Sequence, residues 1–115
     1  MSYYLGLDIG TSGTKALIMD AAGKVLATAT AEHGIYTPRP SWSEQKPAQW
    51  YDSCVAATHA VLAKSGIDGK SVAGIGLSGQ MHGLVITDKT GTPLRDAIIW
   101  NDQRTAEQAV EIERT

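Results

Sequence analysis

The stretch Leu7-Asp-Ile-Gly-Thr-Ser-Gly-Thr-Lys15 predicts a tight hairpin near the start of the chain. An apolar run over residues 3–9 ends in a glycine-rich turn, and a second run over 14–19 follows at once. Two strand-like segments separated by so few residues favour antiparallel pairing. A third alternating run covers residues 25–32, so the first third of the chain predicts an antiparallel β-meander.

The turn of this hairpin suits a bound phosphate. Glycines let the main chain approach a ligand closely, and successive N–H groups in such a turn form a concave nest for phosphate oxygens. Asp8, an acid at the end of the first strand, would hold Mg²⁺ through the water shell that this ion releases reluctantly. The alternative is a plain glycine-rich hairpin in which Asp8 caps the turn, and the spacing is not that of a Walker A loop. The candidate phosphate-binding residues are Gly10, Thr11, Ser12, Gly13 and Lys15.

Residues 34–64 predict a loop followed by a helix. Residues 34–46 contain two prolines and predict a loop, after which Pro47 suits the first position of a helix. That helix is expected to run to about residue 64, with one apolar face formed by Trp50, Cys54, Ala57 and Val61. Cys54 on this face is expected to be inert core.

The second half predicts three more strands, at residues 72–77, 84–87 and 97–100, with Asp102 capping a final helix. The order β-β-β-α-β-β-β-α indicates an α/β fold whose mixed sheet begins with the meander. Gly74-Ile-Gly-Leu-Ser-Gly79 matches the dinucleotide fingerprint by letter, but its glycines lie inside an apolar run instead of opening a helix, so close packing explains them better. Asp20-x-x-Gly23 and Asp88-x-x-Gly91 indicate one turn used twice.

Two polar clusters follow the later strands. Met81 and His82 stand between glycines at a strand end, which suits a cleft, although a structural role is as compatible with the pattern. Trp100, Asn101 and Asp102 place an aromatic ring, an amide and an acid where they can stack on and bond to a polyol. The alternative is equally physical: a core tryptophan and a helix cap.

Composition narrows the class of protein. The chain has 115 residues, 43% of them hydrophobic and 19% charged, with a net charge of −2, which is typical of one ordinary globular domain. Its scattered basic residues give no footprint for nucleic acid, and no apolar run is long enough to cross a membrane. One cysteine fits a reducing cytoplasm. The final helical pattern stops without a closing glycine, asparagine or proline, which favours a truncated chain.

Four motifs stand out along the chain: Leu7-Asp-Ile-Gly-Thr-Ser-Gly-Thr-Lys15, Trp42-Ser-Glu-Gln45, Gly79-Gln-Met-His-Gly83 and Trp100-Asn-Asp-x-Arg104. Together they resemble the FGGY family of carbohydrate kinases. The first motif resembles the phosphate hairpin of the wider actin-like, hexokinase-like and Hsp70-like ATPases, and the last two resemble the narrower branch that acts on D-xylulose. Glycerol kinases carry an Arg-Glu pair at the position of Met81 and His82, so a triol substrate is not the first expectation.

The resemblance implies a ribonuclease-H-like (actin-like ATPase) domain, of which residues 1–115 would be the N-terminal part of domain I. It implies Mg²⁺- and ATP-dependent phosphorylation of D-xylulose at its 5-hydroxyl, in the cytoplasm, with a homodimer as one possible assembly. Asp8 would serve the metal and the phosphates, and the hairpin would face the transferred phosphoryl group. Met81 and His82 would contact the sugar, and Trp100, Asn101 and Asp102 would line the same pocket.

The resemblance also predicts what this segment lacks. The catalytic base of the family is an aspartate later in the first domain, and the adenosine is held by the second domain, so these 115 residues alone are expected to be inactive. Two alternatives remain open from the sequence. One is a kinase for another ketose, a polyol or a sugar acid on the same fold, and the other is a phosphate- or sugar-binding module without chemistry.

Overall fold

The computed structural model describes residues 1–115, which divide into two compact units. The first unit contains residues 1–34 and 48–80, and the second contains residues 35–47 and 81–115.

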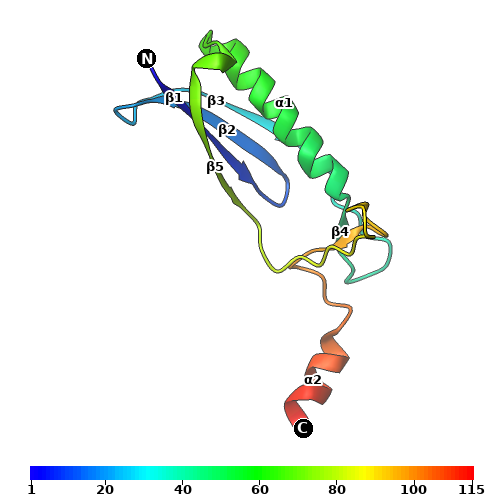
Figure 1. The fold of residues 1–115 in the computed structure, drawn as a ribbon. Coiled ribbons are helices and arrows are strands. Elements are labelled where there is room, and N and C mark those ends of the chain that lie inside the picture. Colours follow the sequence, from blue (N-terminus) through cyan, green and yellow to red (C-terminus); the bar gives the residue numbers. More distant parts are fainter. The chain divides into compact units, whose positions relative to one another are not determined.

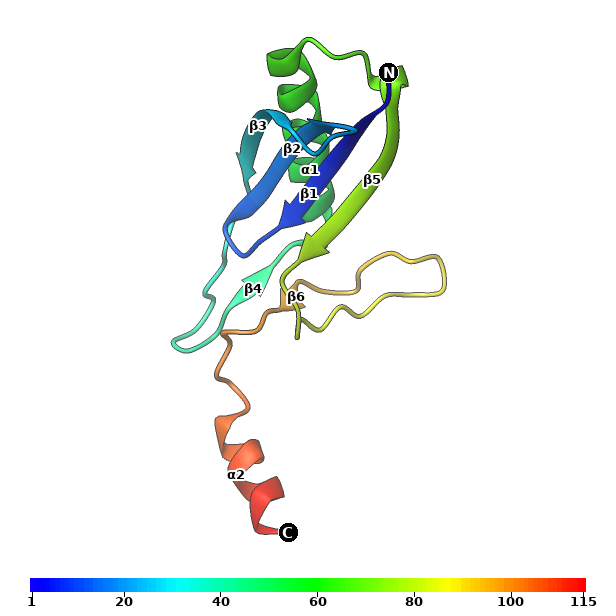
Figure 2. The ribbon, with the colours of Figure 1, turned by 90° about the vertical axis from the view of Figure 1, so that its left-hand side faces the viewer.

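The first unit is built on a four-stranded mixed sheet, as predicted. Strands β1 (Tyr3–Ile9), β2 (Gly13–Asp20) and β3 (Val25–Glu32) form the antiparallel meander, and β5 (Val72–Gly79) pairs parallel to β1. The order across the sheet is β3-β2-β1-β5 (Figure 2). The parallel register brings Ile9 opposite Gly79, so the carboxyl ends of β1 and β5 meet at one edge of the sheet.

Helix α1 (Pro47–Ser65) begins at the predicted proline and lies along one face of this sheet (Figure 1). Its buried residues are Ser53, Ala57 and Val61, whereas Cys54, predicted to be core, is half-buried with its sulfur 3.8 Å from the hydroxyl of the buried Thr14. The core against the helix contains Leu5, Ala16, Ile18, Ala57 and Val61. Burial of each of the larger side chains, Leu5, Ile18 and Val61, stabilises the fold by about 1.5–3 kcal/mol.

The opposite face of the sheet is left open in this chain. Because side chains alternate along a strand, Tyr4, Gly6 and Asp8 of β1 lie on the face away from Leu5 and the core. The stretch Gly74 to Gly79, which matches the dinucleotide fingerprint by letter, lies wholly within β5 and opens no helix, as predicted. A short 3-10 helix, η1 (Gly69–Ser71), precedes that strand.

The second unit contains a two-stranded sheet of β4 (Glu44–Gln45) and β6 (Ala97–Ile98). The segment at 34–46 is therefore a loop only up to β4. The predicted strand at 97–100 is confirmed for its first two residues.

The predicted strand at 84–87 is wrong, because its pairing with the returning chain is interrupted. Leu84 pairs with Ile98, but Ile86 accepts the N–H of Leu94, so between these two contacts one residue on the first arm faces three on the other. Pro93, opposite Thr87, has no N–H to donate. The segment makes isolated bridges in place of a continuous ladder.

The final helix, α2 (Ala106–Arg114), starts later than predicted. Its N-cap is Thr105, and the prediction of Asp102 as cap is wrong, because that carboxylate bonds to Ser43 and Arg104. None of the helices combines the length and the apolar character that a membrane crossing requires.

The two Asp-x-x-Gly phrases form the same turn. The Asp20 carboxylate accepts the N–H groups of residues two and four positions later, and so does that of Asp88. Gly23 and Gly91 adopt φ angles of 86° and 85°, which glycine tolerates best. The prediction of one turn used twice is confirmed.

Candidate functional site

The hairpin between β1 and β2 is narrow and closed by its own main chain. The N–H of Gly10 donates to the carbonyl oxygen of Gly13 over 2.9 Å. A Cβ atom at Gly13 would stand 2.6 Å from the carbonyl oxygen of Ala31, closer than any real side chain sits. Glycine is therefore required here by the close approach of β3.

In this hairpin carbonyl oxygens are hydrogen-bonded, whereas one main-chain N–H is not. The carbonyl oxygens of Gly10 and Ser12 both accept hydrogen bonds from His33. The N–H of Ser12 bonds to no group of the chain, and the residue is exposed. An exposed main-chain donor on a glycine-bounded turn is the group that a phosphate oxygen needs.

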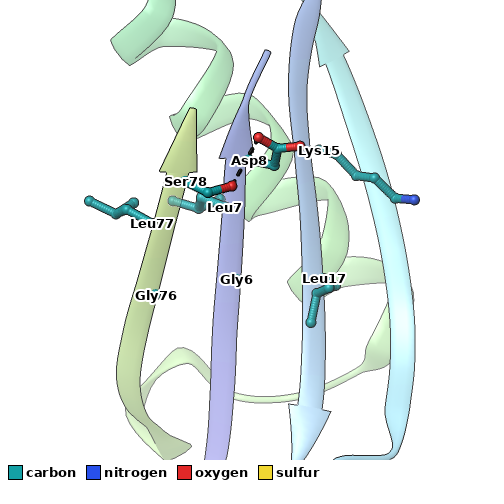
Figure 3. A pocket seen from close by; sticks show the side chains of 8 residues that line it. All are labelled: Gly6, Leu7, Asp8, Lys15, Leu17, Gly76, Leu77 and Ser78. Atoms are coloured by element: carbon teal, nitrogen blue, oxygen red, sulfur yellow. Dashed lines mark hydrogen bonds between the residues drawn. The ribbon is translucent and has the colours of Figure 1, made fainter. Parts of the chain in front are cut away.

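A shallow hollow of about 400 Å³ lies on the open face of the sheet and borders the start of the hairpin (Figure 3). Asp8 is the one acidic residue among those that line it, and its Oδ1 accepts the hydroxyl of Ser78 over 3.0 Å. The side chain of Lys15 extends away from Asp8 (Figure 3). The lining residues are Gly6, Leu7, Asp8, Lys15, Leu17, Gly76, Leu77 and Ser78.

The residues present fit a magnesium–phosphate group. Asp8 is exposed, and the hydrogen bond from Ser78 fixes the direction of its carboxylate. No group of three or more His, Cys, Asp or Glu side chains is placed to enclose a metal in this chain. A single carboxylate suits Mg²⁺ that keeps several waters and takes its other ligands from substrate phosphates.

Two residues at the end of β5 escaped the sequence analysis. Ser78 orients Asp8, and the Gln80 Oε1 lies 3.4 Å from the Thr11 hydroxyl while its N–H donates to Ile9. The available signal was the parallel pairing of two apolar runs, which places the residues that follow them at the same edge of a sheet.

The candidate sugar-binding residues all lie in the second unit. Met81 is 72% exposed and Trp100 55% exposed. His82 has a φ of 64°, a conformation that costs a residue with a side chain about 1–3 kcal/mol and is often kept for function. Leu84 and Ile98 form an isolated bridge between the segments that carry His82 and Trp100. Asn101, next to Trp100, is exposed as well.

Asp102 connects the segment around residues 100–104 to Ser43 through hydrogen bonds. Its carboxylate accepts the N–H of Ser43 over 2.7 Å and bonds to the main chain and guanidinium of Arg104. These hydrogen bonds, above all that from the Arg104 side chain, lower the pKa of Asp102 from 3.8 to about 2, against the opposing effect of burial.

Arg104 joins Asp102 to a second buried acid that sequence analysis did not single out. Its Nη2 lies 2.7 Å from Glu44, which also binds Arg95 over 2.6 Å, and its guanidinium stacks 3.6 Å from the ring centroid of Trp42. Its pKa is raised, chiefly by the hydrogen bond to Asp102. Trp42-Ser-Glu-Gln45 and Trp100-Asn-Asp-x-Arg104 are thus two halves of one cluster.

Comparison with known proteins identifies relatives of the whole chain. The model of the FGGY family of carbohydrate kinases, N-terminal domain, matches residues 3–115. A xylulose kinase of Lactococcus lactis is 42% identical over 116 residues, which cover 97% of this chain and 22% of the relative. A glycerol kinase of Albidiferax ferrireducens is 36% identical, with coverage of 97% and 23%.

A solved structure shows the same arrangement of the backbone. A xylulose kinase from Brucella ovis superposes with a TM-score of 0.91 at 45% identity, over 97% of this chain and 24% of that chain. The predicted α/β, actin-like ATPase fold is confirmed. The chain spans about a fifth of the length of the curated relatives it matches.

Proposed function

Because the chain belongs to the FGGY family of carbohydrate kinases, we propose that it is part of an ATP-dependent kinase that phosphorylates D-xylulose at its 5-hydroxyl. The observation that carries this proposal is the hairpin with an exposed, unbonded N–H at Ser12, beside a carboxylate at Asp8 that Ser78 orients. On this view residues 1–115 are the N-terminal part of the first kinase domain. The cytoplasm, where ATP is made available and thiols stay reduced, suits the single Cys54.

Phosphoryl transfer asks a protein mainly for positioning and for charge stabilisation. Gly10, Thr11, Ser12 and Gly13 would offer main-chain and hydroxyl donors to the transferred group, and Lys15 would add positive charge. Asp8 would hold the water shell of Mg²⁺, whose charge offsets that of the phosphates.

The second unit would supply the contacts to the sugar. Met81 and His82 would touch it directly, and the exposed Trp100 and Asn101 offer a stacking surface and an amide. Asp102, with both carboxylate oxygens bonded inside the unit, would hold this segment of the pocket in place. The xylulose kinases among the relatives support this substrate.

A second candidate is a kinase for another ketose, a polyol or a sugar acid. The similarity to a glycerol kinase supports this second candidate, because glycerol is a polyol. Met81 and His82 favour xylulose, because a thioether and an imidazole make different contacts from the Arg-Glu pair of glycerol kinases.

The proposal is tested by measuring ADP release from the full-length gene product with D-xylulose, D-ribulose, L-rhamnulose, gluconate and glycerol. We expect kcat/KM to be at least about tenfold higher for D-xylulose than for each of the others. A higher kcat/KM for another of these compounds would make that compound the substrate. If none of the five supported ADP release, the kinase function would be rejected.

The role of Asp8 is tested by Asp8→Ala in the same protein. We expect kcat to fall by about 100-fold, because a charge-positioning group of the transition state is lost, while the thermal midpoint stays within a few degrees. Asp52→Ala, an exposed carboxylate on α1, is the matched control and should leave kcat unchanged. Near wild-type turnover with intact Mg²⁺ dependence in Asp8→Ala would reject this role.

A further inference from the structure

A buried histidine lies behind the phosphate hairpin and is not among the residues given a role above. His33 directly follows β3 and is only 9% exposed. Its main-chain N–H donates to the carbonyl oxygen of Ser12 over 3.2 Å, and its Nε2 lies 2.7 Å from the carbonyl oxygen of Gly10. Since a carbonyl oxygen can only accept, Nε2 must carry the hydrogen of that bond.

The other ring nitrogen is held from the opposite side. His33 Nδ1 lies 3.0 Å from the Ser53 hydroxyl, which lies 2.7 Å from the Thr14 hydroxyl. With the hydrogen on Nε2, the Nδ1 of a neutral ring accepts, so the single Ser53 hydrogen goes to His33 and not to the carbonyl oxygen of Trp50, 2.9 Å away, and Ser53 can accept from Thr14. Thr14 is fully buried and Ser53 is 4% exposed, so water does not compete for these bonds.

This chain of side chains links three elements to one loop. Thr14 comes from β2, Ser53 from the buried face of α1, and His33 from the end of β3. Its last bond ends on the first carbonyl of the hairpin. The imidazole orientation is thus set by groups of the core, and the hairpin is held by the imidazole.

Such a clamp matters because carbonyl oxygens repel the phosphate that the N–H groups attract. We propose that His33 is a positioning residue for phosphoryl transfer: it fixes the carbonyl oxygens of Gly10 and Ser12 on the inner side of the hairpin, and leaves the Ser12 N–H for a phosphate oxygen. This inference rests on the proposed kinase function. The preorganisation that it describes is the kind that raises the rate without touching the reacting atoms.

Three substitutions at one position separate the clamp from simple filling of the core. In glutamine the side-chain amide nitrogen stands as many bonds from Cα as the histidine Nε2, whereas in asparagine it corresponds to Nδ1. His33→Gln therefore keeps the donor to Gly10, and His33→Asn keeps only the contact to Ser53. His33→Ala removes both, and His59→Ala, an exposed histidine on α1, is the matched control.

In the full-length gene product we expect His33→Ala and His33→Asn to lower kcat/KM for ATP by about 10- to 100-fold, with the KM for the sugar changed less than about twofold. His33→Gln should recover to within about threefold of wild type, and His59→Ala should match wild type. Thermal midpoints of all variants separate folding from catalysis. A folded His33→Ala with wild-type kcat/KM for ATP, or a glutamine variant no better than asparagine, would overturn the clamp.

The hydrogen on Nε2 gives a readout that does not depend on activity. Long-range ¹H–¹⁵N spectra of protein labelled in histidine should show a hydrogen on Nε2 of His33, assigned by its loss in His33→Gln. A ring with hydrogen on Nδ1 alone would overturn the clamp even in an active enzyme. If wild type has no kinase activity but Nε2 is protonated, the proposed function fails while the clamp geometry stands.

Discussion

At the scale of single residues, the second unit depends on carboxylates that are satisfied by neighbours far away in the sequence. Asp102 is only 2% exposed at its side chain and bonds to Ser43, a residue 59 positions earlier. A buried carboxylate is tolerable only when such partners replace the lost water.

This arrangement makes stability depend on pH. The folded pKa of Asp102, about 2, lies below its unfolded value of 3.8, so the charged form stabilises the folded state. The contribution is fully present above about pH 4 and is lost as the pH falls from about 4 towards 2. After allowance for solvent screening we expect it to be about 1–2 kcal/mol.

The measurement is the free energy of unfolding in urea between pH 7 and pH 2.5, for wild type and Asp102→Asn. The variant should be less stable at pH 7, and the two should converge as the pH falls below 4. Parallel loss of stability in both proteins would show that other groups cause the acid sensitivity.

At the scale of elements, the hairpin is the part in which sequence and packing agree most closely. Gly13 is required because β3 passes behind it, and the nearest atoms to an added Cβ belong to the main chain of Ala31 and Glu32. Main-chain atoms cannot rotate away as a side chain does, so the strands themselves would have to separate.

We therefore expect Gly13→Ala to destabilise the protein by about 1–3 kcal/mol, the usual cost of forcing an extra group into a packed site. Gly76→Ala, in β5 of the same sheet, is the matched control, since an added Cβ there meets nothing within 4 Å. Urea unfolding of both variants checks this. Equal stabilities would show that β2 and β3 adjust more freely than their packing indicates.

The elements also show what a sequence can and cannot predict. Strands β1, β2 and β3 and helix α1 were predictable because each is specified by its own periodic pattern and by the turns between them. Ser53 was not, because its burial on α1 comes from Thr14 and His33, which lie 39 and 20 residues away. A hydroxyl on a helix gives no local sign that it will meet such partners.

The candidate sites follow the same division. Asp8 and the glycines of the hairpin were visible as a local motif, and the resemblance to a family brought in Met81 and His82. Ser78, which orients Asp8, was hidden because it comes from another strand 70 residues later. The predicted strand at 84–87 failed for a related reason: β character does not reveal that the opposite arm has extra residues.

At the scale of the whole molecule, the chain divides into two units, and each unit is stabilised internally by a different kind of interaction. The first unit has an aliphatic core between α1 and its sheet. The second has a cluster of charges, in which Glu44, 9% exposed at its side chain, binds Arg95 and Arg104. All hydrogen bonds and ion pairs of the Glu44 side chain lie inside the second unit.

Glu44→Gln should therefore loosen the second unit selectively. The change leaves the guanidinium of Arg104, which is 11% exposed, with one charged partner fewer, and breaking a buried ion pair in this way costs about 3 kcal/mol. Hydrogen exchange of the full-length protein should become faster at residues 35–47 and 81–104, while β1, β2, β3 and α1 keep their protection.

Asp96→Asn is the matched control, because its ion pair with Lys46 belongs to the same unit but is far more exposed, at 31% and 46% of the two side chains. An exposed pair is screened by solvent and contributes little to stability, so exchange in this variant should remain close to wild type. If Glu44→Gln instead increased exchange equally in α1 and in residues 35–47, the two units would unfold as one, and the charge cluster would support the stability of the phosphate hairpin as well.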